Sequence, residues 1–278
     1  MTDISQHVPS PPPQWVKNFA RFGLTAKGVV YCLVGALAFM AAFEIGNEST
    51  NDANKNGAFR FIISQPYGIA LLALVAVGLA CYAIWRFIQA IKDTTHKGSD
   101  TKGIGRRIGY AFSGAVYGTL AFYAAKMVLG NSTSGGSGDD SRQTFARELL
   151  KQPFGQWLVG IVAVGTIIMG LYQLYRAFSE KYRKQVKSAG LENDAEEMLM
   201  KAGKIGYVAR GIVWMVIGYL FLQAALQANP NEAGGSSSAF QFLENSSYGS
   251  YILGAVALGL ICYGVFMFLQ AKYQATSF

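Results

Sequence analysis

Six long stretches of this chain contain no Asp, Glu, Lys or Arg, and they constrain the fold more than any other feature. A helix that crosses the ~30 Å hydrocarbon core of a membrane needs about 20 apolar residues, and most of the stretches reach that length. Only 14% of the residues are charged, which excludes a soluble enzyme, a disordered chain and a secreted disulfide scaffold. We therefore expect an all-α protein with six transmembrane helices. The stretches are 28–43, 61–85, 108–125, 152–175, 211–231 and 245–271.

The basic residues predict the orientation of these helices. Of the 24 Lys and Arg residues, 18 lie in the two terminal segments and in the connections 86–107 and 176–210, and six lie in the other three connections. Basic residues are enriched on the cytoplasmic side, so we expect both termini in the cytoplasm. The net charge of +8 then reflects topology and attraction to anionic lipid. We expect an integral membrane protein, with the lipid bilayer as its partner and no nucleic acid.

The chain contains three copies of a two-helix unit. When the first helices are aligned on one glycine, a second glycine and an aromatic residue also coincide, and the second helices align on two further glycines. Small residues let apolar helices approach closely in lipid, so we expect these glycines to be helix-packing residues. The aligned positions, copy by copy, are Gly23, Gly109 and Gly206; Gly28, Gly114 and Gly211; Tyr31, Tyr117 and Trp214; Gly68, Gly155 and Gly249; Gly78, Gly165 and Gly259.

The repeats divide the chain into five parts. They are a flexible cytoplasmic tail at 1–19, repeat 1 at 20–93, repeat 2 at 102–182, a cytoplasmic connector at 183–200 and repeat 3 at 201–274. Repeats of two helices keep one orientation, which predicts a pseudo-threefold bundle about the membrane normal.

A short amphipathic segment precedes the second helix of each repeat, and we expect these segments to lie at the outer membrane interface. Pro66 and Pro153 mark the turn that follows, and Ser247 in the third copy predicts a looser turn. At the other end of the second helices, Arg86 and Arg176 are expected to be interface anchors.

The repeated segments resemble a known family. The segments are Gln65-Pro66-Tyr67-Gly68, Gln152-Pro153-Phe154-Gly155 and the ladder Gly78-Leu79-Ala80-Cys81-Tyr82-Ala83-Ile84-Trp85-Arg86. Over about residues 20 to 272, the chain resembles the bacterial integral-membrane family whose members carry three copies of a paired-helix domain of unknown function. The resemblance implies a multi-pass protein of the bacterial cytoplasmic (inner) membrane and brings no catalytic or ligand residues with it.

The sequence is poor in groups that carry chemistry. Both histidines lie outside the six stretches, and Cys32, Cys81 and Cys262 lie inside them without a CxxC spacing. There is no P-loop, dinucleotide fingerprint or G-x-S-x-G turn. We therefore predict no catalytic, cofactor or metal site, and we predict that the chain is not an enzyme.

Two functions stay open on the sequence alone. One is a scaffolding or partner-binding role, in which the cytoplasmic loops bind an unidentified protein. The other is a passive channel or transporter for a small uncharged solute, lined by the aligned aromatics Tyr31, Tyr117 and Trp214.

One polar position is also shared by the repeats. Lys27, Ser113 and Arg210 occupy it near the cytoplasmic side. They form either a polar cluster at the cytoplasmic mouth or, for the two cations, a set of snorkelling anchors.

Overall fold

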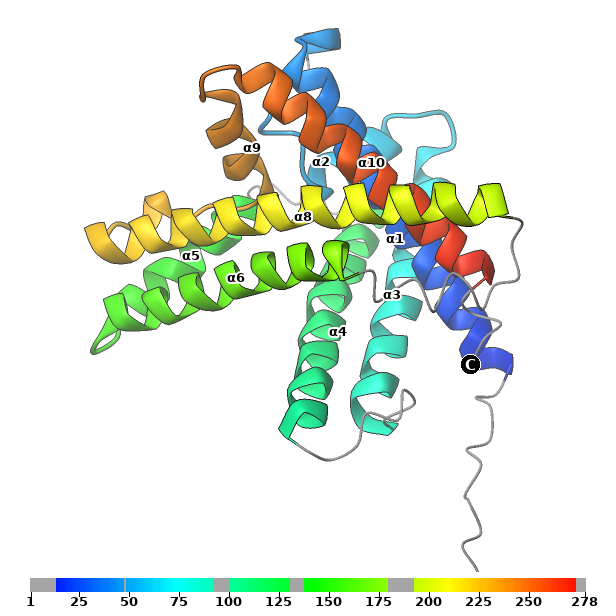
Figure 1. Cartoon of the computed structure of the whole chain (residues 1–278), viewed down its shortest axis with the longest axis horizontal. Coiled ribbons are helices and arrows are strands. Elements are labelled where there is room, and N and C mark those ends of the chain that lie inside the picture. The colour runs from blue at the N-terminus through cyan, green and yellow to red at the C-terminus, as the bar shows by residue number, and fades with distance from the viewer. Residues whose placement is uncertain (1–13, 48, 93–100, 131–137, 180–192, 274–278) are drawn as a thin grey trace, which may run out of the picture.

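A computed structural model describes residues 14–47, 49–92, 101–130, 138–179 and 193–273 (Figure 1). Within these ranges the ordered elements are all helices, so the all-α prediction is confirmed. Five of the described helices are long and apolar enough to cross a membrane. These segments are Lys17–Ala42, Gly68–Ile91, Gly155–Phe178, Glu196–Gln227 and Gly249–Lys272.

Each repeat consists of two long helices with a short helix between them. The long helices are α1 (Gln14–Ala42), α3 (Gly68–Lys92), α4 (Thr101–Val128), α6 (Gly155–Phe178), α8 (Asn193–Gln227) and α10 (Gly249–Tyr273). The short helices are α2 (Lys55–Ile63), α5 (Gly138–Leu150) and α9 (Ser236–Glu244), and two 3-10 turns, η1 (Ile45–Asn47) and η2 (Pro230–Glu232), follow α1 and α8.

The helix α4 is the long helix that does not count among the five apolar ones. It is 28 residues long, so its length suffices to cross a membrane. Polar residues such as Ser113, Tyr117 and Thr119 lower the mean hydropathy of α4, and basic residues occupy its first turns. A sixth transmembrane helix therefore stays a prediction.

Two boundaries differ from those expected from the sequence. The helix α1 begins at Gln14, so part of the predicted flexible tail is helical, and Ala20, just beyond it, packs against Trp85 of α3. The helix α8 begins at Asn193, inside the predicted connector. Both helices extend beyond the apolar stretch because their first turns make further contacts. In α1, Ala20 packs on Trp85, and in α8, Glu197 forms an ion pair with Lys201 one turn away.

The closest packing joins helices of different repeats. The long helices lie side by side as the pairs α1 with α10, α4 with α3 and α8 with α6 (Figure 1). Small residues permit this approach: a Cβ atom on Gly28 would lie 3.0 Å from the carbonyl oxygen of Gly264, and one on Gly211 would lie 3.1 Å from that of Gly170. The packing prediction for Gly28 and Gly211 agrees with these contacts.

In repeats 1 and 3, the two long helices of the repeat also pack against each other, α1 against α3 and α8 against α10. A Cβ atom on Gly23 would lie 2.7 Å from the Cα atom of Tyr82, and one on Gly206 would lie 2.7 Å from the Cα atom of Tyr263. The two contacts occupy equivalent positions in the two repeats, α1 against α3 and α8 against α10. These two hairpins are therefore built alike.

The middle repeat does not close in this way. A Cβ atom on Gly109 or Gly165 would meet nothing within 4 Å, so neither is a helix-packing residue as predicted. The helices α4 and α6 are absent from the closely packed pairs of the described chain, and α6 runs crosswise to α4 (Figure 1). The physical reason lies in two differences between the repeats. Phe112 stands where the other repeats have alanine, and Met169 stands where they have tyrosine.

The turn before each second helix is the same in all three repeats. Tyr67, Phe154 and Tyr248 each adopt a left-handed backbone conformation, with φ of 62°, 62° and 63°. The glycine that follows begins the helix, and a Cβ atom there would strike carbonyl groups of the preceding short helix. The prediction of a looser third turn from Ser247 is wrong, because the glycine and the left-handed residue fix the turn without proline.

Candidate functional site

A buried lysine marks the centre of the candidate site. Lys27 on α1 is only 5% exposed, and its Nζ atom donates a hydrogen bond to the hydroxyl of Tyr82 on α3 at 3.1 Å. The ammonium also lies over four tyrosine rings, which attract a cation through their negative faces. The distances from Nζ to the ring centres are 4.9 Å for Tyr82, 5.2 Å for Tyr117, 5.5 Å for Tyr263 and 5.9 Å for Tyr31. Lys27 is therefore an interior residue and not a snorkelling anchor.

The tyrosines come from five long helices and pack edge to face. We call Tyr31, Tyr82, Tyr117, Tyr207 and Tyr263 the tyrosine cluster. The ring centres are 4.6 Å apart for Tyr82 and Tyr117, 4.9 Å for Tyr31 and Tyr263, and 5.6 Å for Tyr207 and Tyr263. Edge-to-face packing is a geometry that aromatic quadrupoles favour. The cluster thus joins α1, α3, α4, α8 and α10 at one place.

Arg210 of α8 is the second cation of the predicted cytoplasmic-mouth cluster, and the structure brings it to the same place as Lys27. Its guanidinium lies 5.1 Å from the ring centre of Tyr31 and 4.3 Å from that of Tyr263. Its Nε atom is buried without a hydrogen-bond partner. Ser113, the third predicted member, is half-buried on α4 and bonds to neither cation in the described part of the chain.

Two further arginines border the tyrosine cluster. The Nε atom of Arg86 donates to the hydroxyl of Tyr82 at 2.8 Å, and one of its Nη atoms donates to Gln89 at 2.8 Å. The guanidinium of Arg176 on α6 lies 4.6 Å from the ring centre of Tyr207. The sequence predicts interface anchors at both positions, whereas their side chains contact the cluster from α3 and α6.

A fifth cation, Lys55, reaches the cluster from the short helix α2. The ammonium of Lys55 lies 5.3 Å from the ring centre of Tyr117 and 5.9 Å from that of Tyr31. Burial lowers the pKa of Lys55 below its ordinary value of 10.5. Tyr31 opposes this shift, and further positive charges add to it, namely those of Arg142, Arg210 and Lys27.

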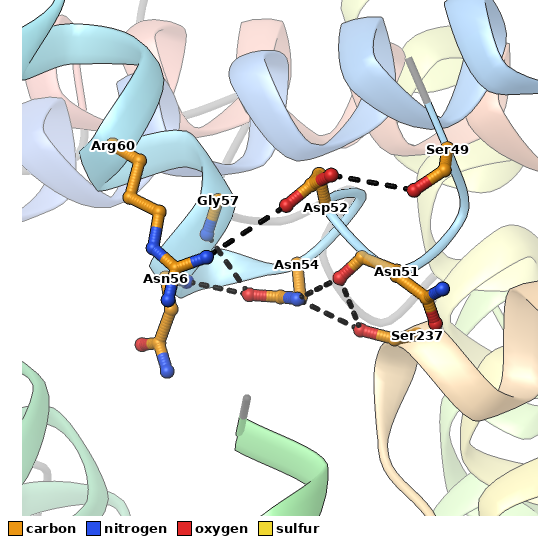
Figure 2. Close-up of polar contacts among 8 residues, drawn as sticks. All are labelled: Ser49, Asn51, Asp52, Asn54, Asn56, Gly57, Arg60 and Ser237. Carbon is orange, nitrogen blue, oxygen red and sulfur yellow. Dashed lines mark hydrogen bonds and ion pairs between the residues drawn. The ribbon is translucent and has the colours of Figure 1, made fainter. Parts of the chain in front are cut away.

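The start of α2 is held in place by a cap (Figure 2). The side-chain oxygen of Asn54 accepts hydrogen bonds from the backbone N–H groups of Asn56 and Gly57, at 2.8 and 3.0 Å. Its amide nitrogen donates to the hydroxyl of Ser237 on α9 at 2.8 Å. Because Lys55 directly follows Asn54, its position depends on this contact between repeats 1 and 3.

The short helices of repeats 1 and 3 are buried against the long ones. Phe59 of α2 and Phe240 of α9 are both fully buried, and Thr50 donates a hydrogen bond to Glu244 at 3.0 Å. These helices therefore pack against the long helices. Their position at the outer membrane interface stays a prediction. The apolar area that the two phenylalanines remove from water explains why they enter the core.

No acidic side chain balances the cations of this site in the described part of the chain. Ion pairs there join exposed side chains, such as Arg60 with Asp52 near the cap of α2 (Figure 2). Lys27, Lys55 and Arg210 instead contact aromatic faces and hydroxyl groups. The site therefore carries an excess of positive charge in the protein interior. Such an excess is costly, because a buried charge without a counter-ion loses its hydration.

The predicted aromatic ring forms only in part. Tyr31 and Tyr117 both lie beside Lys27 in the tyrosine cluster. Trp214 is half-buried on α8 and, within the described residues, makes no ring contact with either. Tyr263 of α10 occupies the place beside Tyr31 instead. Sequence reasoning missed Tyr82 and Tyr263, although they hold the same position in repeats 1 and 3 and a comparison of polar residues between repeats finds them.

The fold and this site define a repeat-built helical protein with membrane-like helices and a central cluster of tyrosines and cations. The chain belongs to the family described as Domain of Unknown Function (DUF1206), which matches at residues 22–93, 108–180 and 205–274. It is 35% identical over 260 residues to "Uncharacterized protein YxxB" of Bacillus subtilis (strain 168), covering 94% of this chain and 92% of the relative. No solved structure matches the chain.

Proposed function

We propose that the chain crosses the bacterial cytoplasmic membrane six times, with α4 as the sixth span and both termini in the cytoplasm. The repeats support this, because α4 holds the position of α1 and α8 and packs on α3 as they pack on their partners. Spans in a bilayer are tilted by about 0–40° from the normal. Six spans therefore require the crosswise course of α6 to change in the membrane, and the three repeats would then form a pseudo-threefold bundle in which the middle hairpin stays the most loosely packed.

Cysteine labelling tests this topology. In a variant without the three native cysteines, Ser99→Cys lies in a connection expected in the cytoplasm and Ser134→Cys in one expected outside. A membrane-impermeant maleimide added to intact cells should label only the second variant, and both should react once the cells are broken open. Labelling of Ser99→Cys in intact cells would overturn the orientation.

The function that the geometry supports best is the binding and passage of a small polar solute through the centre of the protein, without catalysis. The observation that carries this proposal is the meeting of Tyr31 and Tyr117 beside Lys27, on helices of different repeats. Polar groups inside a membrane protein are costly and are typical of substrate pathways. The scaffolding role depends on the cytoplasmic loops, above all on Tyr182–Lys204, of which residues 182–192 lie outside the described residues.

A flux assay tests the pathway. The purified protein in liposomes should pass one or more small solutes from a panel of neutral and charged compounds. Tyr117→Ala should change that flux, because it removes a ring from the tyrosine cluster. Tyr172→Ala is the matched control, since Tyr172 is 52% exposed on α6. Absence of flux across the panel, or the same change in both variants, would refute the pathway.

A further inference from the structure

The cations of the tyrosine cluster form an unbalanced group. Lys27, Lys55 and Arg210 come from three different elements, α1, α2 and α8, and all three cationic groups lie within 5.9 Å of the ring centre of Tyr31. The charges of Lys27 and Arg210 both act on Lys55, and in a medium of low dielectric constant like charges repel one another strongly. The fold nevertheless holds them together, and a ligand of opposite charge would stabilise this arrangement.

The donors of this group also have free capacity. The Nε atom of Arg210 is buried and has no hydrogen-bond partner. Lys27 donates one bond to Tyr82, although an ammonium carries three donors. Arg210, Lys55 and Tyr31 each keep part of their surface accessible, unlike Lys27. Unused donors of cationic groups that surround one tyrosine ring are suited to an acceptor that carries negative charge.

We propose that Lys27, Lys55 and Arg210 bind a small oxyanion, the chemistry that inorganic phosphate shares with the phosphate of a phospholipid headgroup. The guanidinium of Arg210 would donate to two oxygens, and the two ammonium groups would neutralise the remaining charge. The tyrosine rings hold the cations in place when the anion leaves. This inference rests on the proposed function, because it names an oxyanion as the class of solute that the central site binds. The sequence predicts an uncharged solute instead.

Binding of inorganic phosphate to the purified full chain tests the inference. Titration calorimetry in nanodiscs of a neutral phospholipid should show saturable binding, which Arg210→Gln and Lys55→Gln weaken by roughly tenfold or more. Arg147→Gln is the charge-matched control, because Arg147 is exposed on α5. Arg210→Lys keeps a charge and should retain part of the affinity, which separates loss of the site from loss of the fold.

A second arm distinguishes the two sources of the anion. If phosphate binds only weakly in neutral nanodiscs, an anionic phospholipid should bind instead and should compete with phosphate through the same three residues. Failure of both to bind would overturn the inference, as would ultraviolet absorbance of a phenolate at neutral pH, which shows that a tyrosine supplies the balancing charge. Binding without flux refutes only the pathway, and flux of neutral solutes without binding refutes only the oxyanion site.

Discussion

The hairpins of repeats 1 and 3 are closed, whereas the hairpin of repeat 2 is open. All three repeats carry a glycine at the position of Gly23, yet a Cβ atom would meet the partner helix at Gly23 and Gly206 and would meet nothing within 4 Å at Gly109. A small residue on one helix is thus insufficient for packing. The facing residue decides whether the two helices fit together.

The facing residues differ in a way that explains the opening. Gly78 and Gly259 contact the Cβ atoms of Ala26 and Ala209, so each pair of helices meets small residue against small residue. In repeat 2 the position of these alanines is taken by Phe112, which is 60% exposed. A phenylalanine ring cannot occupy the space of a methyl group at that separation.

The largest expected effect comes from filling equivalent glycines in the closed and open hairpins. Gly206→Leu places a side chain against the backbone of Tyr263 and should lower the free energy of unfolding by ~3 kcal/mol. Gly109→Leu enters open space and should change it by less than about 1 kcal/mol. Denaturant titration in micelles measures both values. Equal losses would show that the middle hairpin is closed like the others.

The next largest effect on the free energy of unfolding is expected from removal of the hydrogen bonds of Asn54, which link repeats 1 and 3. Asn54→Ala removes the cap of α2 and leaves Ser237 with one partner fewer, so the free energy of unfolding should fall by ~2 kcal/mol in the same denaturant titration. Asn56→Ala is the control, because Asn56 contributes only its backbone N–H to the cap. A similar loss in both variants would mean that the cap is unimportant.

The third prediction attempts to close the open hairpin. Gly109 and Met169 hold the positions in repeat 2 that Gly23 and Tyr82 hold in repeat 1, where the two helices touch. A variant with Gly109→Cys and Met169→Cys as its only thiols can therefore be cross-linked in membranes when the middle hairpin closes. Phe112→Ala should raise the rate of cross-linking about fivefold, which corresponds to ~1 kcal/mol. Phe122→Ala, elsewhere on α4 and 65% exposed, is the control. An unchanged rate would mean that Phe112 does not hold the helices apart.

Much of the fold could be predicted from the sequence, because apolar length and repeated glycines are local signals. The helices, the three repeats and the turns at Gly68, Gly155 and Gly249 follow from them. The opening of repeat 2 could not be predicted, since it depends on a pair of facing residues that no single helix reveals. Phe112 looks in the sequence like any lipid-facing residue.

The candidate site could be predicted only in part. The sequence predicts an aromatic ring with Tyr31 and Tyr117 and a separate polar cluster with Lys27 and Arg210. The structure brings members of both sets to one place, which the repeat alignment alone does not predict. Lys55 was missed because it belongs to a short helix that the sequence assigns to the membrane interface. Its contact with Tyr31 joins residues from elements that only the tertiary structure brings together.

The smallest expected effect concerns Lys55, which distinguishes repeat 1 from repeat 3, where the aligned residue of α9 is Ser236. Because burial lowers the pKa of Lys55, the unfolded chain binds its proton more tightly than the folded protein does. The free energy of unfolding should therefore rise as pH increases from the folded pKa toward 10.5, and the penalty is fully present at lower pH.

A comparison of wild type with Lys55→Gln over this pH range isolates the lysine. The groups that face it are Arg142 on α5, Lys27 on α1, Arg210 on α8 and Tyr31 on α1, and they are the same in both proteins. The difference in the free energy of unfolding between the two proteins should shrink as pH rises toward 10.5, because the wild type loses its buried charge. A constant difference would mean that Lys55 is hydrated in the folded protein, and repeat 1 would then be no costlier to fold at neutral pH than repeat 3.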